Sequence, residues 1–466
     1  MRTRLLLLTG CVVLCLTMWT SPIAGTVSPT PPGLHSSAAS LPPVFECGGE
    51  PCDAVLRGLR AFLDRTPDGL VGNGRACGDC HMPTDSFQLS PASAEARFQL
   101  VQWRRRWNPD ADDPLFRPID ADDFRTNGDT AFDFSNLRQN GLVRITLPLP
   151  PTIRLIDPVT NAVSNETTVD VWRMVPTVDN VALTGPDAST PVWPRDPNPT
   201  GGYQVDARIT TLQEQAFGAL VNHAQIPQAP QKLLDDLSSF QRTLFTNHRV
   251  RALADAVREG ATTLPDPDPR LNELEQQGKA VFERACSQCH GGPGQSTPVF
   301  PVNRFSTISS QCPRPVDTVT PARFAFTECP PRLARNARTY EIVLSLPTQG
   351  PTGIIPAGTK VRRTSSDPGR ALQTGFVGGP GPFDDWDKFD VPGLRGLRAT
   401  APYFHNNSAA TLEDVVDHYV QFFRRIEALT APGAAASPAA STDGVHFDRI
   451  PRPEERAALL AYLRKL

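Results

Sequence analysis

Several stretches of the chain place apolar residues at helical spacing, and they predict a mainly α-helical protein. The pattern is clear at residues 53–65 and 271–284, and it recurs at 211–221, 231–247, 411–426 and 453–466. Residues 142–156 alternate apolar and polar side chains and predict a β-hairpin. The segments 105–210 and 291–380 are otherwise rich in turn-forming residues, and the chain holds 48 prolines in 466 residues. We therefore expect helices joined by long irregular loops.

The N-terminus has the order of a secretory signal peptide. Arg2 and Arg4 precede a mostly apolar run from Leu5 to Trp19, and small residues follow up to Gly25. The run is short for an uncleaved membrane anchor, and no other segment reaches transmembrane length. We therefore expect a signal peptide at 1–25, a Pro-, Ser- and Ala-rich linker at 26–45, export to the periplasm and no integral membrane span.

Two copies of one unit divide the rest of the chain. The predicted helices at 53–65 and 271–284 each lead into a Cys-x-x-Cys-His motif, and a Pro-rich stretch at 265–269 separates the copies. This weak repeat predicts an N-terminal domain at 46–265 and a C-terminal domain at 266–466 of similar build.

Cysteine usage fits an oxidising compartment. Of ten cysteines, two lie in the signal and four in the motifs, which leaves Cys47, Cys52, Cys312 and Cys329. An even remainder in an exported protein indicates disulfides. Three pairings are possible, and we favour the local ones, Cys47–Cys52 and Cys312–Cys329.

The two motifs themselves predict covalently bound haem. Cys77 and Cys80, like Cys286 and Cys289, can each form thioethers to the vinyl groups of a haem c, and the histidine that follows, His81 or His290, can ligate its iron. A zinc site would need further ligands at zinc spacing, which the sequence near the motifs does not offer. The net charge of −3 gives no reason to expect a nucleic-acid partner. We therefore expect two cytochrome c-like haem domains.

Further motifs resemble the bacterial di-haem cytochrome c peroxidases and the related MauG proteins. The resemblance covers most of residues 55–466, while 105–165 and 291–380 match poorly. The residues that match the family in order and spacing are Arg173, Pro176-Thr177, Asn180, Asp206, Arg208, Leu212-Gln-Glu-Gln-Ala216, Pro392-Gly-Leu-Arg395, Thr400-Ala-Pro-Tyr-Phe-His405 and Leu412-Glu-Asp-Val-Val416.

The resemblance implies roles around the second haem. Tyr419 stands where the peroxidases have a methionine ligand, and a tyrosine there is the MauG pattern, so we expect Tyr419 to ligate this iron opposite His290. His418 beside it is a competing ligand. His405 is implied near this haem, where it can hydrogen-bond a propionate or order its loop.

The resemblance makes the first haem the reactive one. Gln225 takes the place of the family's catalytic glutamate, and it can donate a hydrogen bond but cannot shuttle a proton. His223 can do acid–base work at neutral pH, ligate the iron, or lie at the surface of a helix end. Val205 stands where the family has a tryptophan between the haems. Thr400 and Pro402 match the family's calcium site, but Met174 replaces its asparagine, which argues against calcium.

These features favour a periplasmic di-haem oxidoreductase of the peroxidase type. Hydrogen peroxide is expected at the His81 haem, with electrons arriving through the other haem from a small donor protein or an oxidisable substrate. Two alternatives stay open: a dioxygen-dependent di-haem oxygenase, and an electron carrier in which His223 closes the first iron.

Overall fold

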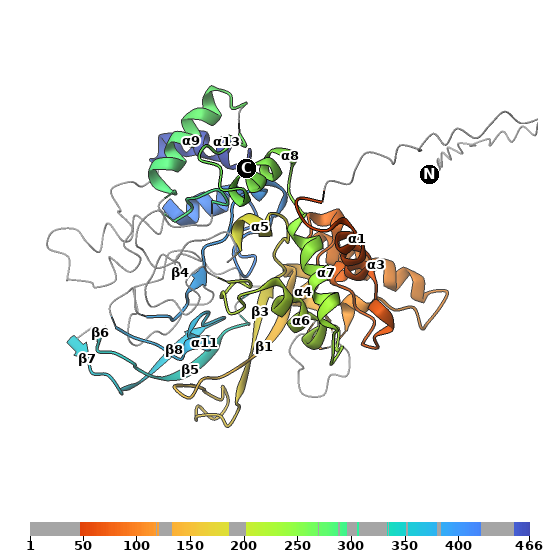
Figure 1. Ribbon diagram of the computed structural model, residues 1–466. Coiled ribbons are helices and arrows are strands. Elements are labelled where there is room, and N and C mark those ends of the chain that lie inside the picture. The colour runs from red at the N-terminus through yellow and green to blue at the C-terminus, as the bar shows by residue number, and fades with distance from the viewer. Residues whose placement is uncertain are drawn as a thin grey trace, which may run out of the picture. The chain divides into compact units, whose positions relative to one another are not determined.

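The computed structural model in Figure 1 describes residues 47–117, 119–120, 133–185, 202–268, 270–287, 289–295, 305–306, 333, 335–350, 353–379, 384–420 and 452–466. The expected signal, linker, Cys312 and Cys329 lie outside these residues. The longer helices are α1 (Cys52–Leu63), α3 (Pro91–Arg105), α6 (Leu212–Asn222), α7 (Gln231–Arg242), α8 (His248–Arg258), α9 (Glu273–Ala285) and α13 (Arg456–Leu463). Short helices are α2 (Cys77–Cys80), α4 (Ser135–Asn140), α5 (Val181–Thr184) and α11 (Ala371–Thr374), and residues 412–420 are also helical.

Helices α1 and α7 pack closely beside the first motif. Val55 and Phe62 are buried on one face of α1, and the Phe62 ring lies 5.3 Å from the Phe240 ring of α7. A Cβ atom on Gly58 would lie 1.9 Å from the backbone oxygen of Asp236, so only glycine allows this approach.

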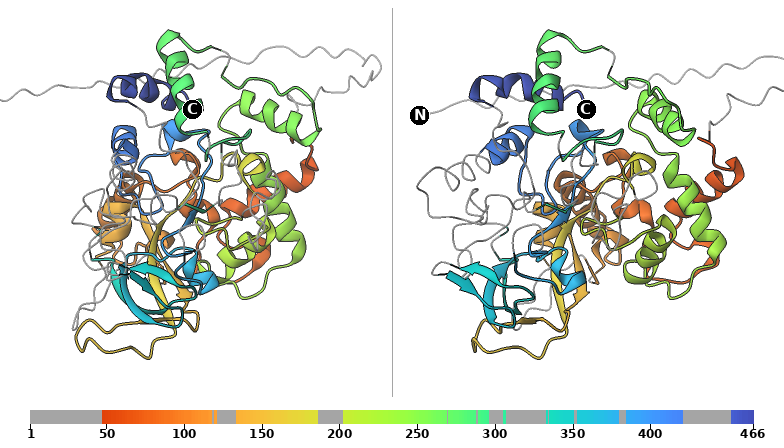
Figure 2. Two further views of the ribbon diagram at one scale, coloured as in Figure 1. Left: turned by 90° about the vertical axis from the view of Figure 1, so that its left-hand side faces the viewer. Right: turned by 60° about the vertical axis from the view of Figure 1, so that its left-hand side comes forward.

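Helices α9 and α13 repeat this packing beside the second motif. A Cβ atom on Gly278 would lie 1.9 Å from the Ala458 backbone oxygen, and the Phe282 and Tyr462 rings are 5.4 Å apart. The views of Figures 1 and 2 agree that the two helices lie side by side. The repeat that the sequence indicated therefore extends to a second, crossing helix in each copy.

Each copy has its own apolar core. One core gathers α1, α6 and α7 around residues such as Phe62, Leu212 and Phe240, and Cys77 packs against it. The other gathers α9, the helix at 412–420 and α13, and Cys286 packs against it. Burial of apolar surface thus stabilises the two haem motifs separately.

The prediction of a hairpin at 142–156 is wrong. Strand β1 (Leu142–Pro148) pairs antiparallel with β3 (Thr168–Met174) instead. Strand β2 (Ile153–Leu155) joins a sheet of order β2-β5-β8 with β5 (Arg338–Val343) and β8 (Lys360–Ser365). The alternation correctly indicated strands, but their partners lie far along the chain.

The expectation of irregular loops at 291–380 also fails for the part that the structure describes. Besides β5 and β8, it contains the pair β6 (Thr348–Gly350) and β7 (Gly353–Ile355), while β4 (Phe305–Ser306) pairs with β9 (Phe389–Asp390). Strand β5 shares a further core with β1, β2 and β3, which contains Tyr340, Ile342 and Trp386. The mainly α-helical prediction is therefore confirmed only in outline.

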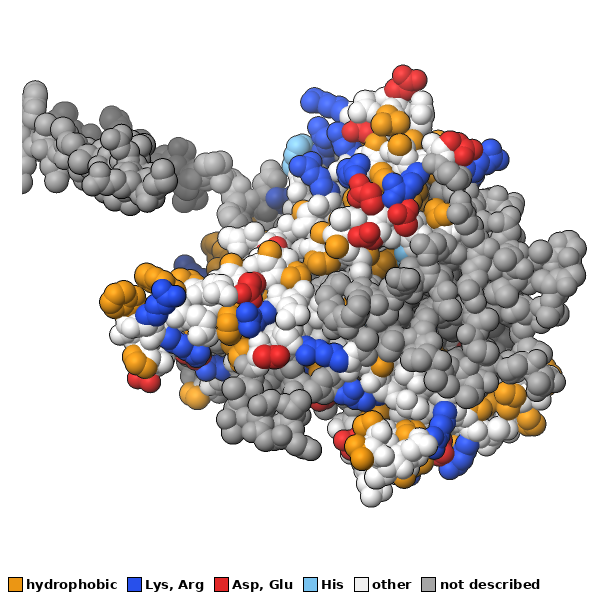
Figure 3. Space-filling model, turned by 180° about the vertical axis from the view of Figure 1, so that it is seen from behind, with side chains coloured by type: hydrophobic (Ala, Val, Ile, Leu, Met, Phe, Trp, Pro, Cys, Tyr) orange, Lys and Arg blue, Asp and Glu red, His pale blue; other side chains and the backbone are white. Residues whose placement is uncertain are grey.

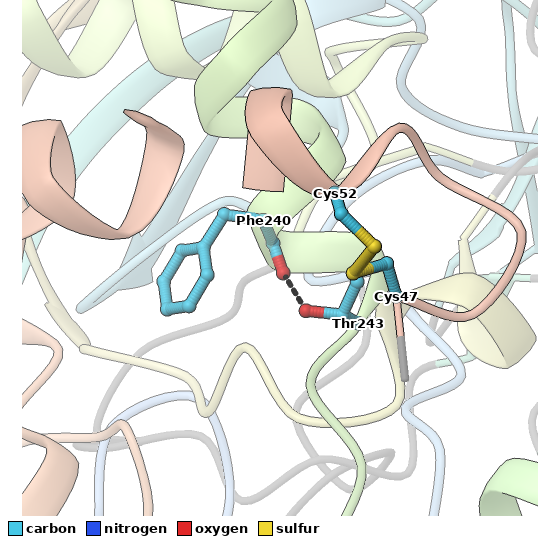
Figure 4. Close-up of a disulfide and its surroundings, with 4 residues drawn as sticks. All are labelled: Cys47, Cys52, Phe240 and Thr243. Atoms are coloured by element: carbon cyan, nitrogen blue, oxygen red, sulfur yellow. Dashed lines mark hydrogen bonds between the residues drawn. A yellow bond between two sulfur atoms is a disulfide. The ribbon is translucent and has the colours of Figure 1, made fainter. Parts of the chain in front are cut away.

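The predicted local disulfide Cys47–Cys52 is confirmed. It closes the turn before α1 and lies beside the end of α7, where the Thr243 hydroxyl donates to the Phe240 carbonyl oxygen at 2.7 Å (Figure 4). Within the described residues, no helix combines the length and the apolar character needed to cross a bilayer. On the described part of the face in Figure 3, basic and acidic side chains are interspersed.

Candidate functional site

The first motif forms the short helix α2 and is held by a buried carboxylate. Asp79 lies between the two cysteines and accepts hydrogen bonds from the Ala76 N–H at 2.9 Å, from Arg65 at 2.9 Å and from Arg97 at 2.8 Å. Burial disfavours the charge of Asp79, but these bonds outweigh it and keep the pKa of Asp79 below its usual range. Three hydrogen-bond donors therefore hold the turn that presents Cys77 and Cys80.

His81 is oriented by its own loop. Its Nδ1 lies 3.1 Å from the Phe87 carbonyl oxygen, which can only accept, so Nδ1 carries the proton. Burial lowers the pKa of His81, which favours the neutral ring. Nε2 is then the nitrogen with a lone pair to offer a metal.

The second motif repeats this arrangement at the end of α9. The His290 N–H donates to the Cys286 carbonyl oxygen at 2.9 Å, and His290 Nδ1 lies 3.1 Å from the Gln295 carbonyl oxygen and 3.2 Å from that of Pro392. Burial lowers the pKa of His290 to about 4. Both histidines are thus neutral and presented through Nε2.

The donor set of each motif fits a haem c. Burial raises the pKa of Cys77 to about 11, and that of Cys80 and of Cys286 to about 12, so these side chains are protonated thiols at neutral pH. No group of three or more metal-type side chains gathers within the described part of the chain. Two thiols and one neutral imidazole on a single turn match thioether attachment with one axial nitrogen.

His223 lies beside the first motif. It ends α6, and its Nδ1 is 2.7 Å from Asp120 Oδ2. Its carbonyl oxygen accepts from Asn73 Nδ2 at 2.8 Å and from Arg75 Nη1 at 3.2 Å, which ties it to the loop before Cys77. His223 is also among the charges that lower the pKa of His81, so the two imidazoles share one neighbourhood.

Gln225 lies beyond the end of α6, two residues after His223. Its side chain is exposed, and its backbone has a positive φ of 56°, in the left-handed region. Its predicted role at the first haem stays a prediction.

Asp120 and Arg75 are site residues that the sequence did not reveal. Asp120 lies in a stretch of the chain rich in aspartate, where carboxylates are usually solvated, but Asp120 is 4% exposed, and Asp113 is paired with Arg97. No spacing rule links Asp120 to a histidine 103 positions later. The one available signal was Arg75, a charged residue two positions before a buried motif.

Tyr419 lies near the second motif. Its ring lies 6.4 Å from that of Phe404, which packs against the same core as Cys286, and burial raises the pKa of Tyr419. His418 is buried at 2% exposure, with its ring 4.7 Å from that of Phe404.

His405 links the matching segment at 400–405 to strand β3. Its ring stacks on Phe389 at 3.9 Å, and its carbonyl oxygen accepts from the Met174 N–H at 2.8 Å. Burial lowers the pKa of His405 to about 4. Neither ring nitrogen has a hydrogen-bond partner among the described residues, so the ring has capacity to bind a further group.

A buried ion cluster joins segments that are far apart in sequence. Arg173 on β3 donates to Asp367 Oδ2 and to Asp206 Oδ2, both at 2.6 Å, and Arg208 adds a contact to Asp206 at 2.8 Å. Arg173, Asp206 and Asp367 are at most 3% exposed. Three motif residues of the resemblance thus act together as a clamp.

Comparisons with known proteins agree with the motifs. No family model matches the chain. Over 82 residues it is 37% identical to the cytochrome-c peroxidase IdrP2 of Denitromonas iodatirespirans, an alignment that spans 18% of this chain and only 18% of that protein.

Solved structures give looser likenesses. A MauG-like protein associated with microbial copper homeostasis is 18% identical over 91% of both chains, with a TM-score of 0.40. The diheme peroxidase BthA from Burkholderia thailandensis E264 is 15% identical over 90% of this chain and 86% of its own, with a TM-score of 0.38. These likenesses are too loose to carry an argument. The sequence likeness to a cytochrome-c peroxidase is thus confined to the 82 aligned residues.

Proposed function

We propose that this chain is a periplasmic di-haem c-type oxidoreductase that reduces hydrogen peroxide at the haem of Cys77, Cys80 and His81. Electrons reach that haem from a second one, bound by Cys286, Cys289 and His290. The observation that carries the proposal is the difference between the two sites. A carboxylate-bonded histidine, His223, lies by the first motif, whereas Tyr419 lies by the second.

The chemistry requires proton transfer as well as electrons. Hydrogen peroxide takes up two electrons and two protons and leaves as two waters, and the haem, when bound, supplies the electrons. With Nδ1 held by Asp120, His223 can use Nε2 to take a proton from one peroxide oxygen and give it to the other, which leaves as water. Gln225 is proposed to donate a hydrogen bond there.

At the second site the helix geometry favours Tyr419 over His418 as the iron ligand. Tyr419 follows Leu412 by seven residues and Val416 by three, so it shares the face that packs in the core containing Cys286. His418 lies about 100° away around the helix, where its ring packs on Phe404, a residue of the same core. A ferric ion would supply the positive charge that a buried phenolate needs.

The two cores support two cytochrome c-like domains, which we place at 46–265 and 266–466. The Cys47–Cys52 disulfide supports an oxidising compartment such as the periplasm. We propose a small donor protein or an oxidisable substrate as the source of electrons.

The test is the reaction of the haem-loaded protein with peroxide. A high-spin ferric component that changes when peroxide is added supports the proposal. His223→Ala is expected to slow this reaction by about 10²–10⁴-fold, because a positioned acid–base group contributes that much. The matched control is His248→Ala, since His248 is exposed at the start of α8.

The same experiment separates the alternatives. Two low-spin haems that are inert to peroxide and carbon monoxide would contradict the proposal. If His223→Ala instead creates an open iron, His223 is a ligand and the chain is an electron carrier. Consumption of dioxygen without peroxide would favour the oxygenase.

Tyr419→Phe tests the second ligand. We expect the second haem to lose its sixth ligand, which gives a new high-spin signal and a higher reduction potential, because a phenolate stabilises ferric iron. His418→Phe is the control and should leave that spectrum unchanged in the folded fraction. The assignment fails if the two variants exchange these results.

A further inference from the structure

Asp120 is built into the first site more firmly than an acid in a surface loop. Both carboxylate oxygens are used: Oδ2 lies 2.7 Å from His223 Nδ1, and Oδ1 accepts from Arg75 Nη1. Arg75 is itself held by the carbonyl oxygens of Pro114 at 3.0 Å and Leu115 at 3.1 Å. The side chains of Asp120 and Arg75 are 5% and 2% exposed, so the pair excludes water.

We propose that Asp120 is the positioning residue that sets the tautomer and ring orientation of His223. A carboxylate paired with an arginine can only accept hydrogen bonds, so the His223 proton is held on Nδ1. Nε2 is left with its lone pair as the nitrogen that acts on peroxide. The inference rests on the proposed function, since it assigns the group through which His223 acts.

The backbone of His223 is secured independently of Asp120. Its carbonyl oxygen accepts from Asn73 Nδ2 at 2.8 Å, and the Ala224 carbonyl oxygen accepts from the Asn73 N–H at 2.8 Å. Loss of the carboxylate therefore frees the ring while the residue stays in place. A role in positioning can thus be separated from a role in folding.

The experiment compares Asp120→Asn with Asp110→Asn in the haem-loaded protein. Asp110 is an exposed carboxylate ten positions earlier in the chain. An asparagine at 120 can donate to Nδ1 and so favours the wrong tautomer of His223. The same effect is known in other enzymes when an aspartate that orients a histidine is replaced by asparagine. We expect the second-order rate constant for peroxide to fall about 10²–10³-fold, with haem content unchanged. Asp110→Asn should react at the wild-type rate.

A double variant decides whether Asp120 acts through His223. Adding Asp120→Asn to His223→Ala should cost no further rate, because groups that act as one unit are not additive. An equal loss in both backgrounds, or a wild-type rate in Asp120→Asn, would overturn the proposal.

A measurement on the unaltered protein removes any dependence on folding of the variants. The ¹⁵N shifts of His223 in the reduced, carbon monoxide-treated protein should show a protonated Nδ1, and a protonated Nε2 would overturn the assignment. If the wild-type protein ignores peroxide while Nδ1 is protonated, the proposed function fails but the positioning by Asp120 stands.

Discussion

Replacing Arg173 by methionine is expected to cost about 3–5 kcal/mol of folding free energy at pH 7, because it strands two buried carboxylates. Asp206 and Asp367 are at most 1% exposed, and Arg173 contacts both of them. Arg208 remains beside Asp206, whereas Asp367 loses its pair with Arg173. Chemical denaturation of both proteins measures the difference.

The pH dependence gives this prediction a sign. Burial opposes the charge of Asp206, but Arg173 and Arg208 outweigh it and lower its pKa. The wild-type protein therefore has the full contribution of this group above the unfolded pKa of about 4 and loses it as the pH falls. Without Arg173, burial prevails and raises the pKa of Asp206. The loss of folding free energy in the variant should therefore become smaller as the pH falls.

Arg57→Met is the matched control for Arg173→Met. Arg57 also pairs with two aspartates, Asp53 and Asp236, but its side chain is 40% exposed. Asp53 is exposed to water, and Lys232 still pairs with Asp236 at 3.0 Å, so the stability should change far less. Equal losses of folding free energy in the two variants, or a loss that does not depend on pH, would contradict the stabilising role of Arg173 in the buried ion cluster.

Replacing both Cys286 and Cys289 by alanine is expected to remove one of two covalently bound haems and to abolish peroxide turnover. Thioether attachment needs these thiols, and the donor site needs its haem for electrons to reach the first site. The pyridine haemochrome spectrum gives the haem content per chain, and haem staining after denaturing electrophoresis shows which haem is covalent.

Replacing both Cys47 and Cys52 by alanine is the control for the cysteine pair. It removes the disulfide but no motif cysteine, so both haems should remain and only stability should fall. If the motif variant still retains two covalent haems, or if the wild-type protein binds zinc in their place, the haem assignment is wrong.

Local features of the site could be predicted from sequence because their physical causes are local. The helix before each motif follows from apolar spacing, and α9 begins at a capping box in which Asn272 and Glu275 bond each other's backbone. The cysteines and the histidine of each motif lie within one turn, so their chemistry is written in consecutive residues. The short disulfide was predictable for the same reason.

Contacts between distant segments could not be predicted in this way. Alternation at 142–156 indicates strands but carries no information about their partners, and β2 pairs with a strand almost 200 residues later. Tyr419 and His418 are neighbours in sequence, so no sequence spacing chooses between them as the ligand.

The sequence by itself determined two haem-type motifs, the helices that lead into them and the family resemblance, since all three depend on residue types at short, fixed spacing. The tertiary structure alone decided which carboxylates are buried. Asp120 reaches His223, and Arg173 joins Asp206 to Asp367, across sequence separations of 33 to 194 positions. The energy of a buried charge depends on what surrounds it in space, and no local pattern in the chain records that surrounding.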